Sequence, residues 1–159
     1  MKYLEIGCFE GRSTVYVGEH ENIKKITAVD TFKGSDELDN LNINFDLVYE
    51  NFKSNMNLLG KKNINIIKDN SDNFFDNNSE TYNLIFLDGS HDASYVKRDL
   101  LNSLDILEKE GVLIIDDFLW LFYEDFYKNP INGIIGCYER ISNELEIIHL
   151  HNLIIFKKK

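Results

Sequence analysis

Strand-length runs of apolar residues recur along the chain and are separated by longer segments of mixed polarity. Each run is rich in Ile, Leu and Val and is apolar on both faces. This pattern is typical of a strand that helices cover on both sides. The runs cover residues 3–6, 26–29, 64–67, 84–87 and 112–115.

The segments between these runs have helical character. Residues 12–19 follow a glycine, and Ser13 is placed to satisfy free amides of a first helical turn. Residues 45–59 and 94–107 carry apolar side chains at spacings of three and four, and Gly111 follows the second stripe as a stop signal. Alternating strands and helices predict an α/β fold with a mostly parallel sheet, doubly wound as an α/β/α sandwich.

The C-terminal part departs from this alternation. Asn129 and Pro130 predict a turn before a helix around residues 131–141. Two strand-like runs, 145–149 and 153–157, lie only a few residues apart and predict a closing antiparallel hairpin. Since no repeat or linker interrupts the chain, we expect one domain over residues 1–159.

Composition narrows the function classes. The chain is 43% hydrophobic with a single proline, a compact globular profile. Its net charge of -10 disfavours nucleic acid and anionic membranes as partners. No apolar run approaches the ~18 residues of a membrane helix, and a strand follows Met1 too closely for a signal peptide. Cys8 and Cys137 have neither metal-ligand nor disulfide-framework spacing, so we expect a cytoplasmic protein.

The first strand leads into a glycine-containing bend. Gly7 and Gly11 permit a sharp turn and close approach to a ligand, and the following helix offers free amides. A dinucleotide loop requires three glycines as G-x-G-x-x-G, whereas Phe9 stands at the central position. Asp30 ends the second strand, where an acid can bind both ribose hydroxyls. Together these residues favour nucleoside binding; the alternatives are an ordinary strand-to-helix turn and a solvated strand end.

These residues carry a family resemblance. Glu5-x-Gly7-x-x-x-Gly11 resembles the first motif of class I S-adenosylmethionine (SAM)-dependent methyltransferases, and Asp30 matches their ribose-binding acid. The strings LEIGCFEGRST, IFLDGSHDASYVKRDL and GVLIIDDF are similar to the macrocin O-methyltransferase branch, and the likeness extends from residue 3 to about residue 157. The resemblance implies a Rossmann-like sheet of seven strands whose last strand is antiparallel.

The resemblance also implies which residues hold SAM. Asn70 and Ser71 follow the third strand, where the family contacts adenine; capping of a short helix is an equal alternative for both. The predicted cofactor-binding residues are Glu5, Gly7, Gly11, Ser13, Asp30, Asn70, Ser71 and Asp88.

Three acids follow two neighbouring strands of the predicted sheet. Asp88 follows one strand, and Asp116 and Asp117 follow the next, so all three belong to the edge that carries the glycine bend. Their mutual repulsion calls for a compensating cation, and oxygen ligands suit Mg²⁺. The related branch is similar in using such acids for a divalent metal that orients the acceptor hydroxyl. Alternatively, Asp88 contacts the methionine part of SAM, and Asp116 and Asp117 cap a helix.

Residues near this edge supply candidates for proton transfer and acceptor binding. His91 or Asp92 could remove the proton from an attacking hydroxyl, although His91 could equally have a structural role or ligate metal. The aromatic-rich residues 118–127 could form an acceptor wall or lid. Packing of these residues as a helix against the sheet is the favoured interpretation.

The sequence thus predicts a SAM-dependent O-methyltransferase, assisted by Mg²⁺, that acts on a hydroxyl of a small molecule or sugar. The chain begins at its first strand, without the preceding helices of related enzymes. A weak SAM-binding module, covered by a partner chain or a second copy, is therefore the alternative. An NAD-dependent oxidoreductase is a third interpretation, which the missing central glycine disfavours.

Overall fold

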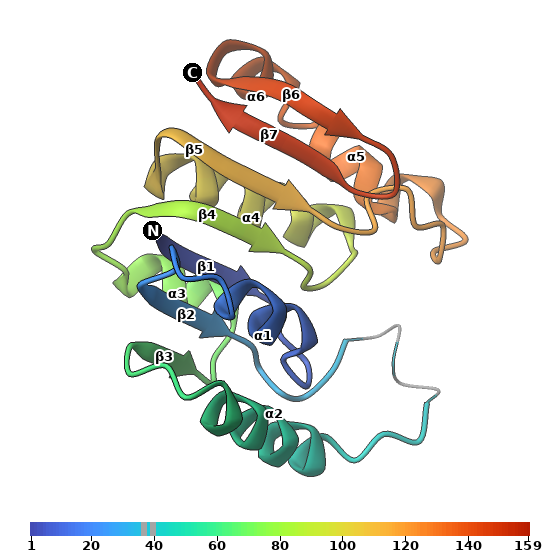
Figure 1. Ribbon diagram of the computed structural model, residues 1–159. Coiled ribbons are helices and arrows are strands. Elements are labelled where there is room, and N and C mark those ends of the chain that lie inside the picture. The colour runs from blue at the N-terminus through green and yellow to red at the C-terminus, as the bar shows by residue number, and fades with distance from the viewer. Residues whose placement is uncertain (36–37, 39–40) are drawn as a thin grey trace.

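A computed structural model describes residues 1–35, 38 and 41–159, and these form one seven-stranded sheet (Figure 1). The strand order is β3-β2-β1-β4-β5-β7-β6. The strands are β1 Lys2–Ile6, β2 Lys25–Val29, β3 Ile64–Ile67, β4 Tyr82–Leu87, β5 Leu107–Ile115, β6 Leu145–Leu150 and β7 Ile154–Lys158. Strands β1 to β5 pair in parallel, while β7 runs antiparallel to both β5 and β6. The predicted Rossmann-like sheet and its C-terminal hairpin are confirmed.

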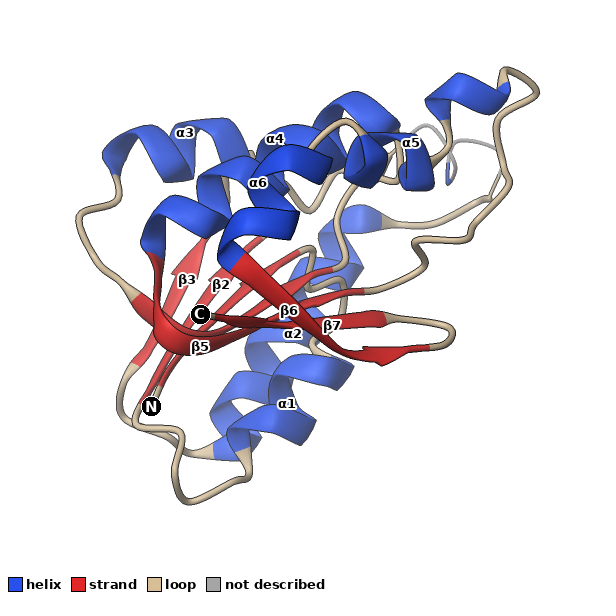
Figure 2. Cartoon of the chain, turned by 90° about the horizontal axis from the view of Figure 1, so that it is seen from above, coloured by secondary structure: helices blue, strands red, loops and turns tan. Residues whose placement is uncertain are grey.

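Helices cover both faces of this sheet (Figure 2). Helices α1 and α2 lie on one face, and α3, α4, α5 and α6 lie on the other. Their bounds are α1 Arg12–Gly18, α2 Phe45–Leu59, α3 Ser71–Asn77, α4 Ala93–Ile106, α5 Pro130–Ile135 and α6 Tyr138–Glu144, with a short 3₁₀ helix, η2, at Phe126–Lys128. Among the described residues, no helix has the length and apolar character needed to cross a membrane.

The two long helices bury the stripes that their spacing predicts. In α2 the side chains of Val48, Phe52 and Met56 are buried, and Asn44 caps the first turn by accepting from the amides of residues 46 and 47. In α4 the buried apolar side chains include Leu100 and Leu104. Removing such side chains from water is the main stabilising contribution of both helices.

Two predicted boundaries were wrong. Gly111 does not stop α4, because the helix ends at Ile106 and β5 starts at Leu107, whose backbone is already extended. Gly111 instead lies within β5, where a Cβ would come 2.7 Å from the Glu108 carbonyl oxygen. The helix expected around residues 131–141 is divided into α5 and α6 at Gly136, and Pro130, predicted to lie in the preceding turn, is the first residue of α5 after the cap residue Asn129.

The loop after β1 packs directly on the end of β4. The Gly7 amide donates to the Val29 carbonyl at 2.9 Å, and the Asp88 amide donates to the Ile6 carbonyl at 2.9 Å. Gly7 has a φ of 84°, and a Cβ on it would lie 2.1 Å from the Asp88 carbonyl oxygen. Only glycine combines this backbone conformation with this contact.

We predict that Gly7→Ala destabilises the protein by at least about 2 kcal/mol more than Gly60→Ala. Both glycines have positive φ, but a Cβ on Gly60 would meet nothing closer than 3.8 Å. Urea unfolding followed by circular dichroism gives both free energies of unfolding. Equal losses in the two variants would contradict the close packing of the Gly7 bend.

Candidate functional site

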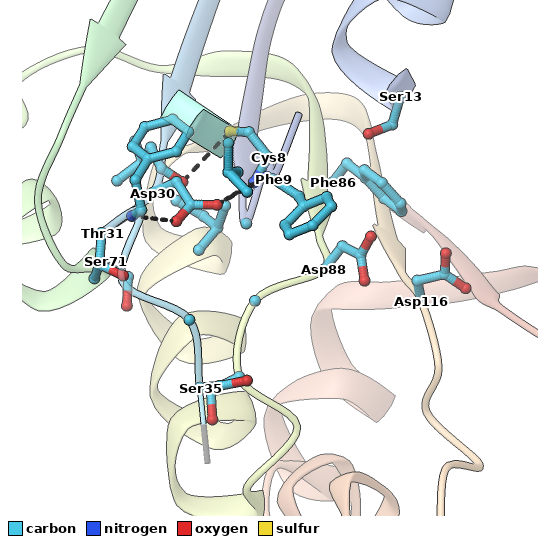
Figure 3. Close-up of a pocket in the computed structure, with 18 of the residues that line it drawn as sticks. Cys8, Phe9, Ser13, Asp30, Thr31, Ser35, Ser71, Phe86, Asp88 and Asp116 are labelled. Atoms are coloured by element: carbon cyan, nitrogen blue, oxygen red, sulfur yellow. Dashed lines mark hydrogen bonds between the residues drawn. The ribbon is translucent and has the colours of Figure 1, made fainter. Parts of the chain in front are cut away.

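A cleft of about 1250 Å³ opens where the parallel strands end. Its lining includes one residue after each of the strands β1 to β5: Gly7, Asp30, Asp69, Asp88 and Asp116. Figure 3 shows Asp30 toward one end of this cleft and Asp88 with Asp116 toward the other. The glycine bend and the acids that follow four strands therefore face a single cavity.

Asp30 holds the glycine bend in place. Its Oδ2 accepts from the amides of Cys8 at 2.8 Å and Phe9 at 2.9 Å, and its Oδ1 accepts from the Phe32 amide at 2.7 Å. Three of the roughly four acceptor positions of the carboxylate are thus used by backbone. Asp30 also lines the cleft, so its remaining acceptor capacity is available to a ligand.

Glu5 does not line the cleft, which corrects the expectation that it contacts a ligand. It is fully buried beneath the bend, and its Oε1 accepts from the Ser13 hydroxyl. Burial raises the pKa of Glu5 to about 7, against the opposing effect of the Ser13, Thr14 and Tyr3 hydroxyls. Ser13 lines the cleft but does not cap α1. Gly11 occupies the cap position, and the Ser13 hydroxyl donates to Glu5.

The start of α3 forms another part of the wall. Asn70 lines the cleft and also caps α3, since its side chain accepts from the Asn73 amide at 2.8 Å. Ser71 lines the cleft beside Asp99 of α4, to which its hydroxyl donates. Asp99 was not predicted: it is 95% buried, and burial raises its pKa to about 6. The sequence feature that could have indicated Asp99 is its position next to Leu100, a member of the buried apolar stripe of α4.

The structure brings Asp88, His91 and Asp117 together. His91 Nε2 lies 3.8 Å from Asp88 Oδ1 and 3.9 Å from Asp117 Oδ2, and each residue offers one potential ligand atom within 4.8 Å of the others. Burial raises the pKa of Asp88, although a hydrogen bond from His91 opposes this shift. Asp116 is not part of this group, and its Oδ1 accepts from the Asp117 amide at 2.9 Å. Among the described residues, the group whose ligand atoms lie close enough to hold a metal ion is therefore Asp88, His91 and Asp117.

Asp92 lines the cleft but has a structural partner. It caps α4, and its Oδ1 accepts from the Ser94 amide at 2.9 Å and from the Ser94 hydroxyl at 2.5 Å. These hydrogen bonds fix the Asp92 carboxylate at the start of α4. Of the two proton acceptors that the sequence suggests, His91 is the one beside Asp88.

Residues 118–125 do not form a helix, so the favoured expectation of helix packing against the sheet was wrong for them. Phe118 is buried, whereas the next four side chains are exposed. The Trp120 ring stacks on His91 at a centroid distance of 5.4 Å and an interplanar angle of 5°. Tyr123 lines the cleft, so this segment borders the candidate site.

Comparison with known proteins identifies the family. A sequence family described as a methyltransferase domain matches residues 4–118. This match covers most of the chain, and the chain therefore belongs to that family. Comparison with curated protein sequences gave no match.

Solved methyltransferases share the fold along almost the whole chain. The O-methyltransferase TomG of Streptomyces achromogenes, in complex with SAM, has a TM-score of 0.72 at 11% identity, over 99% of this chain and 73% of that one. A Bacillus cereus O-methyltransferase, in complex with S-adenosylhomocysteine (SAH), has a TM-score of 0.68 at 15% identity, over 99% of this chain and 74% of that one. An rRNA methylase of Streptococcus thermophilus has a TM-score of 0.69 at 14% identity, over 99% of this chain and 86% of that one.

The buried carboxyl group of Glu5 gives a testable dependence of stability on pH. Because its folded pKa of about 7 exceeds the ordinary 4.5, the stability it contributes is present below about pH 4.5 and is lost as pH rises to about 7. We predict that Glu5→Gln gains about 3 kcal/mol relative to the wild type between about pH 4.5 and pH 8. Urea unfolding at both pH values measures this difference.

Glu80→Gln is the matched control. Glu80 is partly exposed, and its hydrogen bond from Lys25 lowers the pKa of Glu80. Its stability difference from the wild type should therefore change little, and in the opposite direction. If Glu5→Gln followed the wild type at both pH values, Glu5 would not be a buried acid with a raised pKa.

Proposed function

We propose that this chain is a SAM-dependent O-methyltransferase, related to the macrocin branch, that acts on a hydroxyl of a small molecule. The observation that carries the proposal is the single cleft that joins the glycine bend and Asp30 to Asp88 and its neighbouring acids. Family membership and the SAM or SAH complexes of structural neighbours support it.

The described residues fit a nucleoside at one end of this cleft. Gly7 lines the cleft at the bend, and the Asp30 carboxylate offers its remaining acceptor position to a ribose hydroxyl. Gly11, predicted to bind the cofactor, is buried against Phe52 and Met56 of α2 and does not line the cleft. Asn70 and Ser71 face the position proposed for adenine. A single G-x-x-x-G spacing supplies no pyrophosphate cradle, which favours SAM over NAD.

When bound, SAM supplies a sulfonium methyl group: the carbon–sulfur bond breaks, its electron pair returns to sulfur, a carbon–oxygen bond forms and the acceptor hydroxyl loses its proton. The protein's part is positioning and proton removal. The bend and Asp30 fix one reactant, while Asp88 and Asp117 orient the acceptor hydroxyl. His91, beside both acids, receives the proton.

Asp88 and Asp117 are also the proposed ligands of Mg²⁺, which prefers carboxylates and water to imidazole. When bound, the ion would offset the repulsion between the acids and lower the pKa of the acceptor hydroxyl. His91 then remains close to the site as a base. Asp116, which the sequence suggested as a third ligand, is left out of the proposed set because it does not belong to the group with Asp88, His91 and Asp117.

A small molecule fits this site better than RNA, although one structural neighbour is an rRNA methylase. The net charge is -10, and eight acids line the cleft: Glu10, Glu19, Asp30, Asp69, Asp88, Asp92, Asp99 and Asp116. Arg12 is the one Lys or Arg among the described lining residues. A phosphate backbone would be repelled here.

We predict that SAH binds the purified protein and that Asp30→Asn weakens this binding by more than about tenfold. The NH₂ group of the asparagine would face a backbone amide that now donates a hydrogen bond to Asp30. Two donors would then oppose each other, and the bend would be distorted. Isothermal titration calorimetry measures the affinity. Asp76→Asn, at an exposed position of α3, is the control and should bind like the wild type. Absence of SAH binding by the wild-type protein would refute the proposed function.

The cation site separates two neighbouring aspartates. We predict that Asp117→Asn weakens Mg²⁺ binding by about tenfold or more, whereas Asp116→Asn changes it by less than about threefold. Calorimetric titration of Mg²⁺ into SAH-saturated protein measures both values, and SAH affinity should be unchanged in each variant. An equal loss in both variants would return Asp116 to the ligand set.

A further inference from the structure

One wall of the cleft is formed by the start of α3 and by one side of α4. Asn70 and Ser71 belong to the first of these elements, and Tyr95 and Asp99, about one helical turn apart, belong to the second. Figure 3 shows Ser71 and Asp30 toward the same end of the cleft. Since the proposed function places the ribose at Asp30, this wall is the part of the cleft that the attached base would meet.

Contacts between α3 and α4 hold this wall in place. Arg98 Nη2 lies 2.8 Å from Asp72 Oδ2, so an ion pair joins the two helices. The Arg98 guanidinium also lies over the Tyr95 ring, 4.4 Å from its centroid. The side chains that face the cleft are therefore carried by two helices that contact each other, as selective recognition requires.

The direction of the Ser71 hydroxyl is set by Asp99. A serine hydroxyl has one hydrogen to donate and lone pairs that accept. The Ser71 hydrogen is donated to the Asp99 carboxylate, which is 5% exposed and can only accept when it is ionised. Turning this hydrogen toward the cleft would deprive a buried carboxylate of its donor, which is unfavourable. Toward a ligand, Ser71 therefore offers an acceptor and not a donor.

The Asn70 side chain offers the opposite polarity. Its Oδ1 accepts from the Asn73 amide at 2.8 Å, because Asn70 caps α3. This bond distinguishes the two ends of the Asn70 amide and leaves the NH₂ group as the end that can meet a ligand. Asp69, which also lines the cleft, adds a second carboxylate that accepts. The wall thus combines a donor with a larger number of acceptors.

This combination is complementary to the edge of adenine. That edge carries an exocyclic amine, which donates, next to a ring nitrogen, which accepts. Hypoxanthine carries an oxygen and a protonated ring nitrogen at the same positions, so both polarities are reversed. Its oxygen would face the Ser71 lone pairs and the negative charge of Asp99, and a site built for one polarity discriminates strongly against the other.

We propose that Asp99 is a positioning residue for the base of the cofactor: by holding the Ser71 hydroxyl as an acceptor, it selects adenine over hypoxanthine. Asp99 acts through Ser71 and needs no contact of its own with the ligand. The inference rests on the proposed function, because it names how the same site distinguishes its cofactor.

Two ligands that differ only in this group measure the selectivity. Calorimetric titration at about pH 8 compares SAH with S-inosylhomocysteine, in which hypoxanthine replaces adenine. Asp99 is ionised at this pH, because burial raises its pKa only to about 6. We predict that the wild type binds SAH more tightly than S-inosylhomocysteine by about twentyfold or more.

Asp99→Asn is the sharper test, because it should gain affinity for one ligand. An aspartate can only accept, whereas an asparagine can turn its NH₂ group toward Ser71 and release the hydroxyl hydrogen for the ligand. We predict that this variant binds S-inosylhomocysteine more tightly than the wild type does by about fivefold or more. Its SAH affinity should change by less than about threefold, since the asparagine oxygen can still accept from Ser71.

Two further variants separate the hydroxyl from the helix contact. Ser71→Ala should weaken SAH binding by about fivefold and change S-inosylhomocysteine binding by less than about threefold, because only the amine loses an acceptor. Asp72→Asn is the matched control. It removes another acid between α3 and α4, together with the ion pair to Arg98, but leaves the hydrogen bond from Ser71 to Asp99. The ratio of its two affinities should equal the wild-type ratio.

Equal affinity of the wild type for the two ligands would overturn the inference. A loss of affinity for both ligands in Asp99→Asn with an unchanged ratio would also overturn it, because Asp99 would then have only a structural role. If circular dichroism shows that this variant does not fold, the ratio in Ser71→Ala decides, and an unchanged ratio there overturns the inference. SAH binding by the wild type leaves the proposed function intact in each case, whereas its absence would refute that function.

Discussion

The contact between the Gly7 backbone and the Asp88 carbonyl is the constraint on which the site depends. Parallel pairing of β1 with β4 brings these two strand ends together, and the missing Cβ lets the bend lie flat against the neighbouring strand. Asp30 then fixes the other side of the bend through the amides of Cys8 and Phe9. The ends of β1, β2 and β4 are thus held together in one rim.

Burial of acids is the second feature that the fold has to accommodate. Desolvation raises the pKa of Glu5, Asp88 and Asp99, so the protein holds these carboxyl groups in an environment that disfavours their charge. Hydroxyl groups from Ser13 and Ser71 offset part of this cost for Glu5 and Asp99. Asp88 faces the cleft beside other acids, and a positively charged ligand there would relieve the remaining repulsion. The repulsion among these acids therefore supports the proposed binding of a sulfonium and a divalent cation.

Much of this architecture could be predicted because it rests on local periodicity. The stripe of α2 and the runs that become the strands are visible in the sequence, and the glycine spacing identifies the bend. Side-chain direction could not be predicted in the same way. Glu5 points beneath the bend because alternate residues of β1 face opposite sides of the sheet, and His91 meets Asp117 through loops that have no period. The end of α4 was misplaced because Leu107 continues the apolar stripe while its backbone is already extended.

The two ends of the cleft impose different chemical demands on a ligand. Toward Asp30 the ligand meets backbone amides and short polar side chains, which suit the hydroxyls and amines of a nucleoside. Toward Asp88 it meets the carboxylates of Asp88, Asp92 and Asp116. In-line transfer requires the acceptor oxygen to approach the methyl group from beyond the cofactor, so the oxygen lies at the acids.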